Sequence, residues 1–269
     1  MLKATIALIT DFGAGSYHAG VLRGVIQKIN PECDVIDVTH EISPFNVVEA
    51  MYILESASGY FPVPTIFAVI VDPGVGTNRR PLIGIGENNY YVCPDNGVFS
   101  RVLKSDSFSK VVHIQEEHYM LKNKSHTFHG RDVFAPCAAW LSKIMSAENF
   151  GEAIDDYLVL ESPKIRIIQA RTLEATILFA DHFGNLVTNF ELDYLMKARQ
   201  KYPGNTIRIN AGNRMINSIS SCYYDVPNPG DSVAYFGSMN LLEIGLRESN
   251  AQNILGLNPG DVVTLYFGE

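Results

Sequence analysis

The chain has 269 residues, of which 46% are hydrophobic and 19% charged, and its net charge is −8. These values are typical of a globular protein with one large or two medium domains. The acidic balance, with no block of basic residues, argues against a nucleic-acid partner, and no apolar run is long enough to predict a membrane span.

The first part of the chain predicts alternating strands and helices. Three apolar runs predict strands, at Ala4–Ile9, Asp34–Val38 and Thr65–Val71. Between them, one helix is expected after the capping residue Ser16 and before Asn30-Pro31, and a second over Val47–Ser58. This order predicts parallel strands with helices on both faces, and ligands bind such sheets at the carboxyl ends of the strands.

The middle of the chain predicts a hairpin and a further helix. The segments Pro81–Gly86 and Tyr90–Cys93 are expected to pair across Glu87–Asn89, and Val133–Met145 is expected to be helical, with Pro136 in its first turn. Helical structure beginning at Val133 would place His129 in the loop just before a helix N-terminus, where backbone N–H groups point outward.

The pattern changes near Ser162–Thr172, after which the period of two that is typical of strands dominates. The strands are expected at Leu173–Ala180, Thr206–Asn210, Ser232–Phe236 and Val262–Phe267. Two N-P-G-D sequences, Asn228–Asp231 and Asn258–Asp261, predict type II turns, and one helix is expected near Leu241–Ser249. We predict an α/β domain over residues 1–165, with a mostly parallel sheet flanked by helices. A smaller, mostly antiparallel β-barrel-like domain is predicted over residues 172–269.

Cysteine usage and motifs exclude several kinds of site. The spacing of the four cysteines suits neither zinc nor a disulfide framework, so all are expected to be buried, reduced thiols: Cys33, Cys93, Cys137 and Cys222. No HExxH, G-x-S-x-G, C-x-x-C or EF-hand motif is present, so neither a metal nor a cofactor is expected. The N-terminal apolar run is too short for a signal peptide, and we expect a cytoplasmic protein.

Asp72 is the strongest candidate for a functional residue. It directly follows a buried strand and opens the loop P-G-V-G-T-N-R-R. Its position favours a ligand or catalytic role, and the alternative is a cap for the turn Pro73–Gly76. The loop lacks the G-K-[ST] ending of a phosphate loop, so its glycines are expected to let the backbone approach a ligand or another chain. Arg79 and Arg80 are either surface charges or a partner that keeps Asp72 ionised.

Two further residues are candidates in the same domain. His129, in F-H-G-R-D, is a possible proton acceptor or a structural histidine, while Arg131 and Asp132 beside it suggest a local ion pair and a helix cap. Asp11, at the end of the first strand, is suited to ribose hydroxyls, with a cap of the turn Phe12–Ser16 as the alternative.

Candidates for recognising a flat ring lie in both domains. Asn185, in D-H-F-G-N, has an amide that can donate to and accept from a base edge, or it belongs to a plain turn. Phe45, Tyr223 and Tyr224 are suited to stacking on a ring or to an interface.

Together these motifs resemble the S-adenosylmethionine (SAM) hydroxide adenosyltransferases, which are related to the SAM-dependent fluorinase and chlorinase. The resemblance runs from Thr10 to about Gly260. It rests on T-D-F-G, V-I-D-V-T-H-E-I-S-P-F-N, V-D-P-G-V-G-T-x-R, P-D-N-G, F-H-G-R-D-V-F-A-P and D-x-F-G-N-x-x-T-N.

The resemblance implies hydrolysis of SAM to adenosine and methionine by a homotrimer, with the site between the N-terminal domain of one subunit and the C-terminal domain of the next. It implies a water-activating set of Asp72, Arg79 and His129, and a ribose contact from Asp11. Asn185, Ser238, Tyr223 and Glu243 would contact adenine or methionine. Phe45 lies where the halogenases carry a tryptophan along the substrate.

The chemistry of these residues agrees with water as the nucleophile. The thioether leaves SAM as a neutral group, so the task is to present an oxygen nucleophile in line with the ribose C5′ carbon. A nearby base removes the water proton, and either Asp72 or His129 is suited to that task. Two alternatives remain: a non-catalytic SAM or adenosine sensor, and halide-dependent chemistry. The Asp72 carboxylate disfavours the latter by repelling anions.

Overall fold

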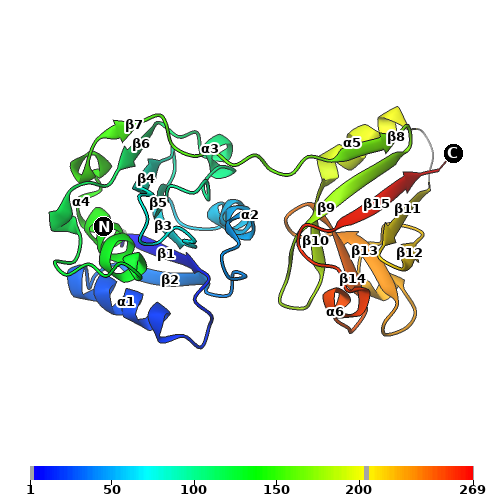
Figure 1. The fold of residues 1–269 in the computed structure, drawn as a ribbon, viewed down its shortest axis with the longest axis horizontal. Coiled ribbons are helices and arrows are strands. Elements are labelled where there is room, and N and C mark those ends of the chain that lie inside the picture. The colour runs from blue at the N-terminus through cyan, green and yellow to red at the C-terminus, as the bar shows by residue number, and fades with distance from the viewer. Residues whose placement is uncertain (1–2, 203–205, 269) are drawn as a thin grey trace. The chain divides into compact units, whose positions relative to one another are not determined.

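The computed structural model describes residues 3–202 and 206–268, and the chain divides into two compact units, Met1–Glu161 and Ser162–Glu269 (Figure 1). Each unit has its own sheet; the first has a hydrophobic core on each face of its sheet, and the second has one core. Across the described part of the chain, no helix is both long and apolar enough to cross a membrane.

The first unit is built on a seven-stranded sheet in the order β2-β1-β3-β5-β4-β6-β7. The neighbours among β2, β1, β3 and β5 are parallel, and the remaining pairs are antiparallel. The strands are β1 (Thr5–Thr10), β2 (Asp34–Thr39), β3 (Thr65–Ile70), β4 (Pro81–Ile85), β5 (Tyr90–Pro94), β6 (Lys110–His113) and β7 (Ala153–Ile154). The predicted α/β class and the predicted hairpin, β4-β5, are confirmed.

Helices cover both faces of this sheet. They are α1 (Tyr17–Ile29), α2 (Val47–Ser58), α3 (Val102–Ser105) and α4 (Ala135–Ile144). Helices α1 and α4 share one core with Ile6 and Leu8 of β1, whereas α2 and α3 share another with Ala7 and Ile9 of the same strand. A strand buried on both faces needs apolar residues throughout, which is why β1 and β3 lack polar–apolar alternation.

The helix boundaries agree with local sequence signals in two cases and differ in a third. Ser16 caps α1 by accepting from the backbone N–H of His18, and α2 has its predicted bounds. The third case is the helix predicted over Val133–Met145. Helical structure there begins at Gly130, because a π-helical turn over Gly130–Phe134 precedes α4. His129 is therefore the residue immediately before this turn.

The second unit is an antiparallel sheet in the order β12-β11-β15-β9-β10-β14-β13, with β8 also paired to β9. Its end strands β12 and β13 contact each other, so the sheet is nearly closed, and the predicted barrel-like architecture is confirmed. The strands are β8 (Arg166–Gln169), β9 (Thr172–Ala180), β10 (Leu186–Glu191), β11 (Ile207–Ala211), β12 (Arg214–Ile216), β13 (Ser232–Phe236), β14 (Leu241–Leu246) and β15 (Val262–Phe267).

The predicted helix Leu241–Ser249 is wrong, because Leu241–Leu246 forms strand β14. All six residues of β14 are buried between β10 and β13. A strand buried on both faces has a continuous apolar run whose period does not distinguish it from a helix. The helices of this unit are instead α5 (Leu192–Lys201) and α6 (Ala251–Leu255), and neither they nor β10 were predicted.

The two N-P-G-D turns are confirmed. In each, the aspartate N–H donates to the asparagine carbonyl, and the glycine has a positive φ, +83° at Gly230 and +94° at Gly260. Each turn leads into a strand of the sheet. All four cysteines are free thiols, but Cys222 is exposed, so the expectation of burial is wrong for that residue.

Candidate active site

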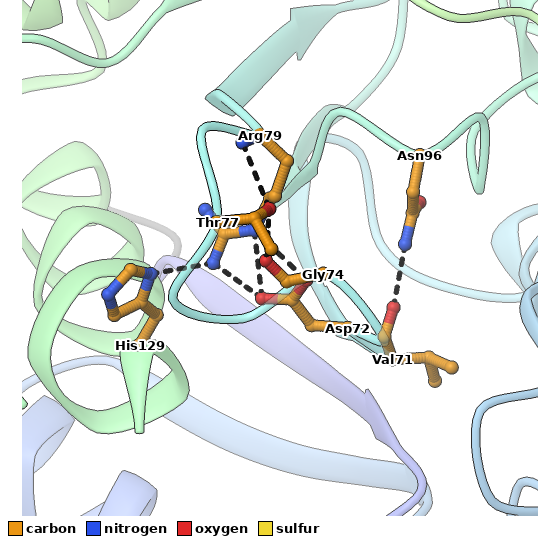
Figure 2. A network of polar contacts seen from close by, with 7 residues as sticks. All are labelled: Val71, Asp72, Gly74, Thr77, Arg79, Asn96 and His129. Atoms are coloured by element: carbon orange, nitrogen blue, oxygen red, sulfur yellow. Dashed lines mark hydrogen bonds and ion pairs between the residues drawn. The ribbon is translucent and has the colours of Figure 1, made fainter. Parts of the chain in front are cut away.

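Asp72 lies just beyond the end of β3, at the carboxyl edge of the parallel part of the sheet. The preceding residue, Val71, is held by Asn96, whose amide nitrogen donates to the Val71 carbonyl over 2.8 Å (Figure 2). This bond ties the strand end to the P-D-N-G turn and fixes the point from which the Asp72 side chain extends.

The Asp72 carboxylate binds Arg79 from the same loop (Figure 2). Arg79 Nε lies 2.9 Å from both carboxylate oxygens, Nη2 lies 2.5 Å from Oδ2, and both side chains are less than 10% exposed. The capping alternative is not observed. Backbone bonds close the loop, from the Val75 N–H to the Asp72 carbonyl and from the Thr77 N–H to the Gly74 carbonyl. The Thr77 hydroxyl adds to them by donating to the Gly74 carbonyl and accepting from the Arg79 N–H.

Arg80 has a different set of partners from Arg79. Its guanidinium pairs with Asp95 and with Asp156. The sequence left open which arginine accompanies Asp72, and the structure assigns that position to Arg79.

His129 reaches the same guanidinium from the other side. Arg79 Nη2 lies 2.7 Å from His129 Nδ1, and because a guanidinium can only donate, Nδ1 must be the accepting nitrogen. A neutral His129 in this contact carries its proton on Nε2. Burial, and then the positive charge of Arg79, lower the pKa of His129, so the imidazole is neutral at pH 7.

Gly76 explains how the Asp72 loop reaches the segment that carries His129. A Cβ at this position would lie 2.5 Å from the backbone oxygen of His126, and φ is +79°. Only glycine permits this contact without a backbone shift. The close approach expected of the loop glycines is therefore made, at Gly76, to the chain's own backbone.

Asp11 lies at the same edge of the sheet as Asp72, since Thr10 of β1 pairs with Ile70 of β3. Its Oδ2 accepts the backbone N–H of Phe45 over 2.9 Å. Phe45 has a φ of +66° and is 70% exposed, although a left-handed conformation is unfavourable for a residue with a side chain. Within the turn Phe12–Ser16, the Phe12 N–H donates to Thr10 Oγ1, the Gly13 N–H to the His40 carbonyl and the Ser16 N–H to the Gly13 carbonyl, so these three groups bond to acceptors other than Asp11.

The other residues near His129 include the expected ion pair. Arg131 donates to both oxygens of Asp132, which is fully buried and also accepts the Ser125 N–H. Asp132 lies inside the π-helical turn, so it does not cap the helix.

In the second unit, Asn185 ends a tight loop between β9 and β10. Asp181 orders this loop by accepting the backbone N–H groups of Phe183 and Asn185 with one carboxylate oxygen. Its other oxygen accepts from the Asn185 amide nitrogen over 2.8 Å. The same amide nitrogen lies 2.8 Å from the Tyr223 hydroxyl.

A pocket of about 410 Å³ surrounds this loop within the second unit. Its walls are formed by Phe183, Asn185, Tyr223, Tyr224, Leu246, Arg247, Glu248 and Ser249. Phe183 and Tyr224 are more than 70% exposed, and the Arg247 guanidinium lies 4.3 Å from the centre of the Tyr224 ring. Exposed aromatic faces beside one amide suit a flat ring with a polar edge.

Some pocket residues were missed from the sequence, and some predicted residues lie outside its lining. Phe183 had a usable signal, an aromatic residue within D-H-F-G-N, whereas Arg247 had none, because it follows a strand that was taken for a helix. Ser238 is exposed in the turn between β13 and β14, and Glu243 is buried in β14, so neither lines the pocket.

Potential metal ligands do not cluster in the described residues. Among residues 3–202 and 206–268, no group of three or more His, Cys, Asp or Glu side chains is placed to hold a metal ion.

Two family models match the chain: the SAM hydroxide adenosyltransferase N-terminal domain over residues 6–151 and the C-terminal domain over residues 175–264. The chain belongs to the SAM hydroxide adenosyltransferase family. The Asp72, Arg79 and His129 side chains lie in the adenosyltransferase N-terminal domain, and the pocket at Asn185 lies in its C-terminal domain.

Named relatives of this chain align over nearly its whole length. A protein of Methanocaldococcus jannaschii, named (R)-S-adenosyl-L-methionine hydrolase, is 30% identical over 97% of this chain and 95% of its own. A fluorinase of Actinopolyspora mzabensis is 24% identical over 96% of this chain and 95% of its own. A crystal structure of an uncharacterised Thermotoga maritima protein is 33% identical, with a TM-score of 0.86 over 97% of this chain and 99% of that one.

Proposed function

We propose that this chain hydrolyses SAM to adenosine and L-methionine by attack of water at the ribose C5′ carbon. The observation that carries the proposal is the joining of Asp72 and His129 by one Arg79 guanidinium, in a chain of this family. Relatives with about 30% identity are named (R)-SAM hydrolases, so the proposed substrate is SAM with the R configuration at sulfur.

Asp72 is the proposed proton acceptor. Water is a poor nucleophile, and a carboxylate that removes its proton as the carbon–oxygen bond forms lowers the barrier. His129 is less suited to this task, because its Nδ1 is occupied by Arg79 and its Nε2 carries the proton. We assign His129 to holding Arg79 and donating from Nε2 to the attacking water. The sulfonium leaves as a neutral thioether, so no general acid is needed.

The nucleophile is water rather than halide in this proposal. Asp72 is a carboxylate, and a negative charge beside the attacking position repels a halide anion. The fluorinases are also the more distant relatives, at 24% identity or below among those compared.

The remaining residues are proposed to bind the substrate. Asp11 would hold the ribose hydroxyls, and Phe45 would lie along the substrate. Asn185 and Tyr223 would contact adenine in the pocket that they line, and Ser238 would contact the adenine or methionine part. The proposed enzyme needs no cofactor and no metal, since SAM is the substrate and its leaving group is neutral.

The assembly and location are also part of the proposal. We propose a homotrimer in the cytoplasm, in which the N-terminal domain of one subunit and the C-terminal domain of the next complete each site. The family resemblance of both domains supports this arrangement. Sedimentation tests the oligomeric state, and a monomer or a dimer would contradict the proposed trimer.

The test is incubation of the protein with each sulfur epimer of SAM, followed by chromatography for adenosine. We expect adenosine from the R epimer and a loss of about a hundredfold or more in rate for Asp72→Asn. The matched control is Asp95→Asn, which removes the carboxylate that pairs with the neighbouring Arg80. No adenosine from either epimer, or equal rates for the two variants, would contradict the proposal.

The alternative is a SAM sensor without turnover. Calorimetry that shows stoichiometric SAM binding, with the SAM intact hours later, would support the sensor. Formation of halogenated nucleoside that rises with chloride or fluoride would support a halogenase. We expect neither.

A further inference from the structure

A chain of hydrogen bonds runs through the second unit from the pocket wall to a buried carboxylate on strand β14. Asn185 Nδ2 lies 2.8 Å from the Tyr223 hydroxyl, and Tyr223 hydrogen-bonds to the Tyr235 hydroxyl. The Tyr235 hydroxyl donates to Glu243 over 2.6 Å. The chain therefore links a residue of the pocket wall to a carboxylate that does not line the pocket.

The direction of every bond in this chain follows from its two ends. Asn185 Nδ2 can only donate, so Tyr223 accepts from it. Because the single Tyr235 proton goes to Glu243, the proton in the bond between the two tyrosines comes from Tyr223. Tyr235 in turn donates to Glu243, which accepts as a carboxylate. Glu243 is 8% exposed, and its partner across the β13–β14 ladder is Tyr235 itself.

The second hydrogen of the Asn185 amide is also committed. Nδ2 donates one hydrogen directly to the Asp181 carboxylate, over 2.8 Å to Oδ2. It donates the other to Tyr223, the start of the chain that ends at the Glu243 carboxylate. Among the described residues, no donor hydrogen-bonds to Asn185 Oδ1. Glycine at position 245 helps to leave this oxygen uncovered, because a Cβ there would lie 2.7 Å from it.

We propose that Glu243 is a positioning residue that acts through Tyr235 and Tyr223 to hold the Asn185 carbonyl oxygen available to the pocket. A pocket with an accepting oxygen and exposed aromatic faces selects a flat ring with an N–H donor on its edge. This inference rests on the proposed function. The pocket then selects adenine, a 6-amino purine, over a 6-oxo purine, because the 6-oxo oxygen would face the Asn185 oxygen and both atoms are acceptors.

This assignment differs from direct contact between Glu243 and the substrate. Burial raises the pKa of the Glu243 carboxyl, while the bond from Tyr235 opposes that change. The Glu243 carboxylate accepts a hydrogen bond from Tyr235 and does not belong to the pocket lining.

The test measures binding of adenosine and of inosine to the full-length protein by calorimetry at one fixed pH. The wild type is expected to prefer adenosine. The amide of the Glu243→Gln variant can donate as well as accept, so the Tyr235 hydroxyl is no longer required to donate toward residue 243. Its adenosine-to-inosine affinity ratio is expected to fall about tenfold, the equivalent of one hydrogen bond. Tyr235→Phe interrupts the chain and is expected to lower the ratio similarly.

The matched control is Tyr91→Phe in the first unit. Tyr91 also donates to a buried carboxylate, Asp106, over 2.8 Å, but it lies outside the pocket and the chain of bonds. This variant is expected to keep the wild-type ratio. Thermal unfolding of each variant establishes that the folded protein is being compared.

Three outcomes overturn the inference. They are a folded Glu243→Gln protein with the wild-type ratio, equal weakening of both nucleosides, and a wild type without preference between them. In each case SAM hydrolysis by the wild type, measured alongside, shows whether the proposed function still stands. A wild type that neither binds adenosine nor hydrolyses SAM rejects the proposed function itself.

Discussion

The Arg79 guanidinium faces the Asp72 carboxylate with Nε 2.9 Å from both carboxylate oxygens. Its Nη2 is also the group that contacts His129, so one planar cation holds a carboxylate and an imidazole in a fixed relation. Lysine has the same charge, but as a point charge on a flexible stem it cannot make these directional contacts together.

Arg79→Lys is therefore expected to lower kcat for SAM hydrolysis about a hundredfold, while KM changes little. Arg80→Lys is the matched control, because Arg80 is adjacent in sequence yet pairs with Asp95 and Asp156. Steady-state kinetics of both variants checks the prediction. Equal effects at the two positions would mean that charge in the loop matters and the Arg79 contacts do not.

The lowered pKa of His129 predicts how activity and stability depend on pH. The imidazole must be neutral to accept from Arg79, so the acid limb of kcat/KM that His129 controls is expected below the ordinary histidine value of 6.5. The unfolded chain binds this proton more readily than the folded one. The stability from the neutral histidine is thus present above the unfolded pKa and is lost as pH falls through the lowered folded pKa.

His129→Asn is the matched variant for that profile, since an amide oxygen can accept from Arg79 but does not titrate. We expect this variant to lose the acid-side change in stability that belongs to His129, as measured by thermal unfolding across pH. An unchanged dependence would assign the titration to another group.

The positive φ of Phe45 predicts that substitutions at this position affect stability and activity in different ways. Its φ of +66° favours glycine, and its exposed ring contributes little burial, so Phe45→Gly is expected to be more stable than Phe45→Ala by about 1 kcal/mol. Both variants lack the ring and are expected to raise KM for SAM. Chemical denaturation and kinetics check the two parts separately. If glycine and alanine proteins are equally stable, the strain argument fails.

Gly76→Ala is expected to destabilise the first unit. The added Cβ would lie 2.5 Å from the His126 backbone oxygen, and φ is positive, so the loop must move away from the segment that carries His129. We expect a loss of about 1–3 kcal/mol in the free energy of unfolding, together with lower kcat. Gly15→Ala is a suitable control, because a Cβ there meets no atom within 4 Å. A Gly76→Ala protein as stable and active as the control would contradict this account.

Local signals in the sequence were sufficient for much of the first unit. Ser16 and Asn30 bound α1 because a capping side chain and the Asn-Pro stop act over a few residues. The two N-P-G-D turns were predicted from the same kind of local signal, since a proline–glycine pair restricts the backbone locally. The same kind of evidence failed at β14, where burial on both faces removed the alternation that distinguishes a strand.

The sequence by itself determined the order β1-α1-β2-α2-β3 and the hairpin β4-β5 of the α/β unit, and the two N-P-G-D turns. It also identified Asp11 and Asp72 as strand-end residues and placed His129 just before a helix. Only the tertiary structure decided that Arg79 rather than Arg80 joins Asp72, which nitrogen of His129 accepts, and that Glu243 lies behind the pocket wall. The physical reason is range. Caps and turns depend on neighbouring residues, whereas these contacts require close packing of side chains up to 50 residues apart.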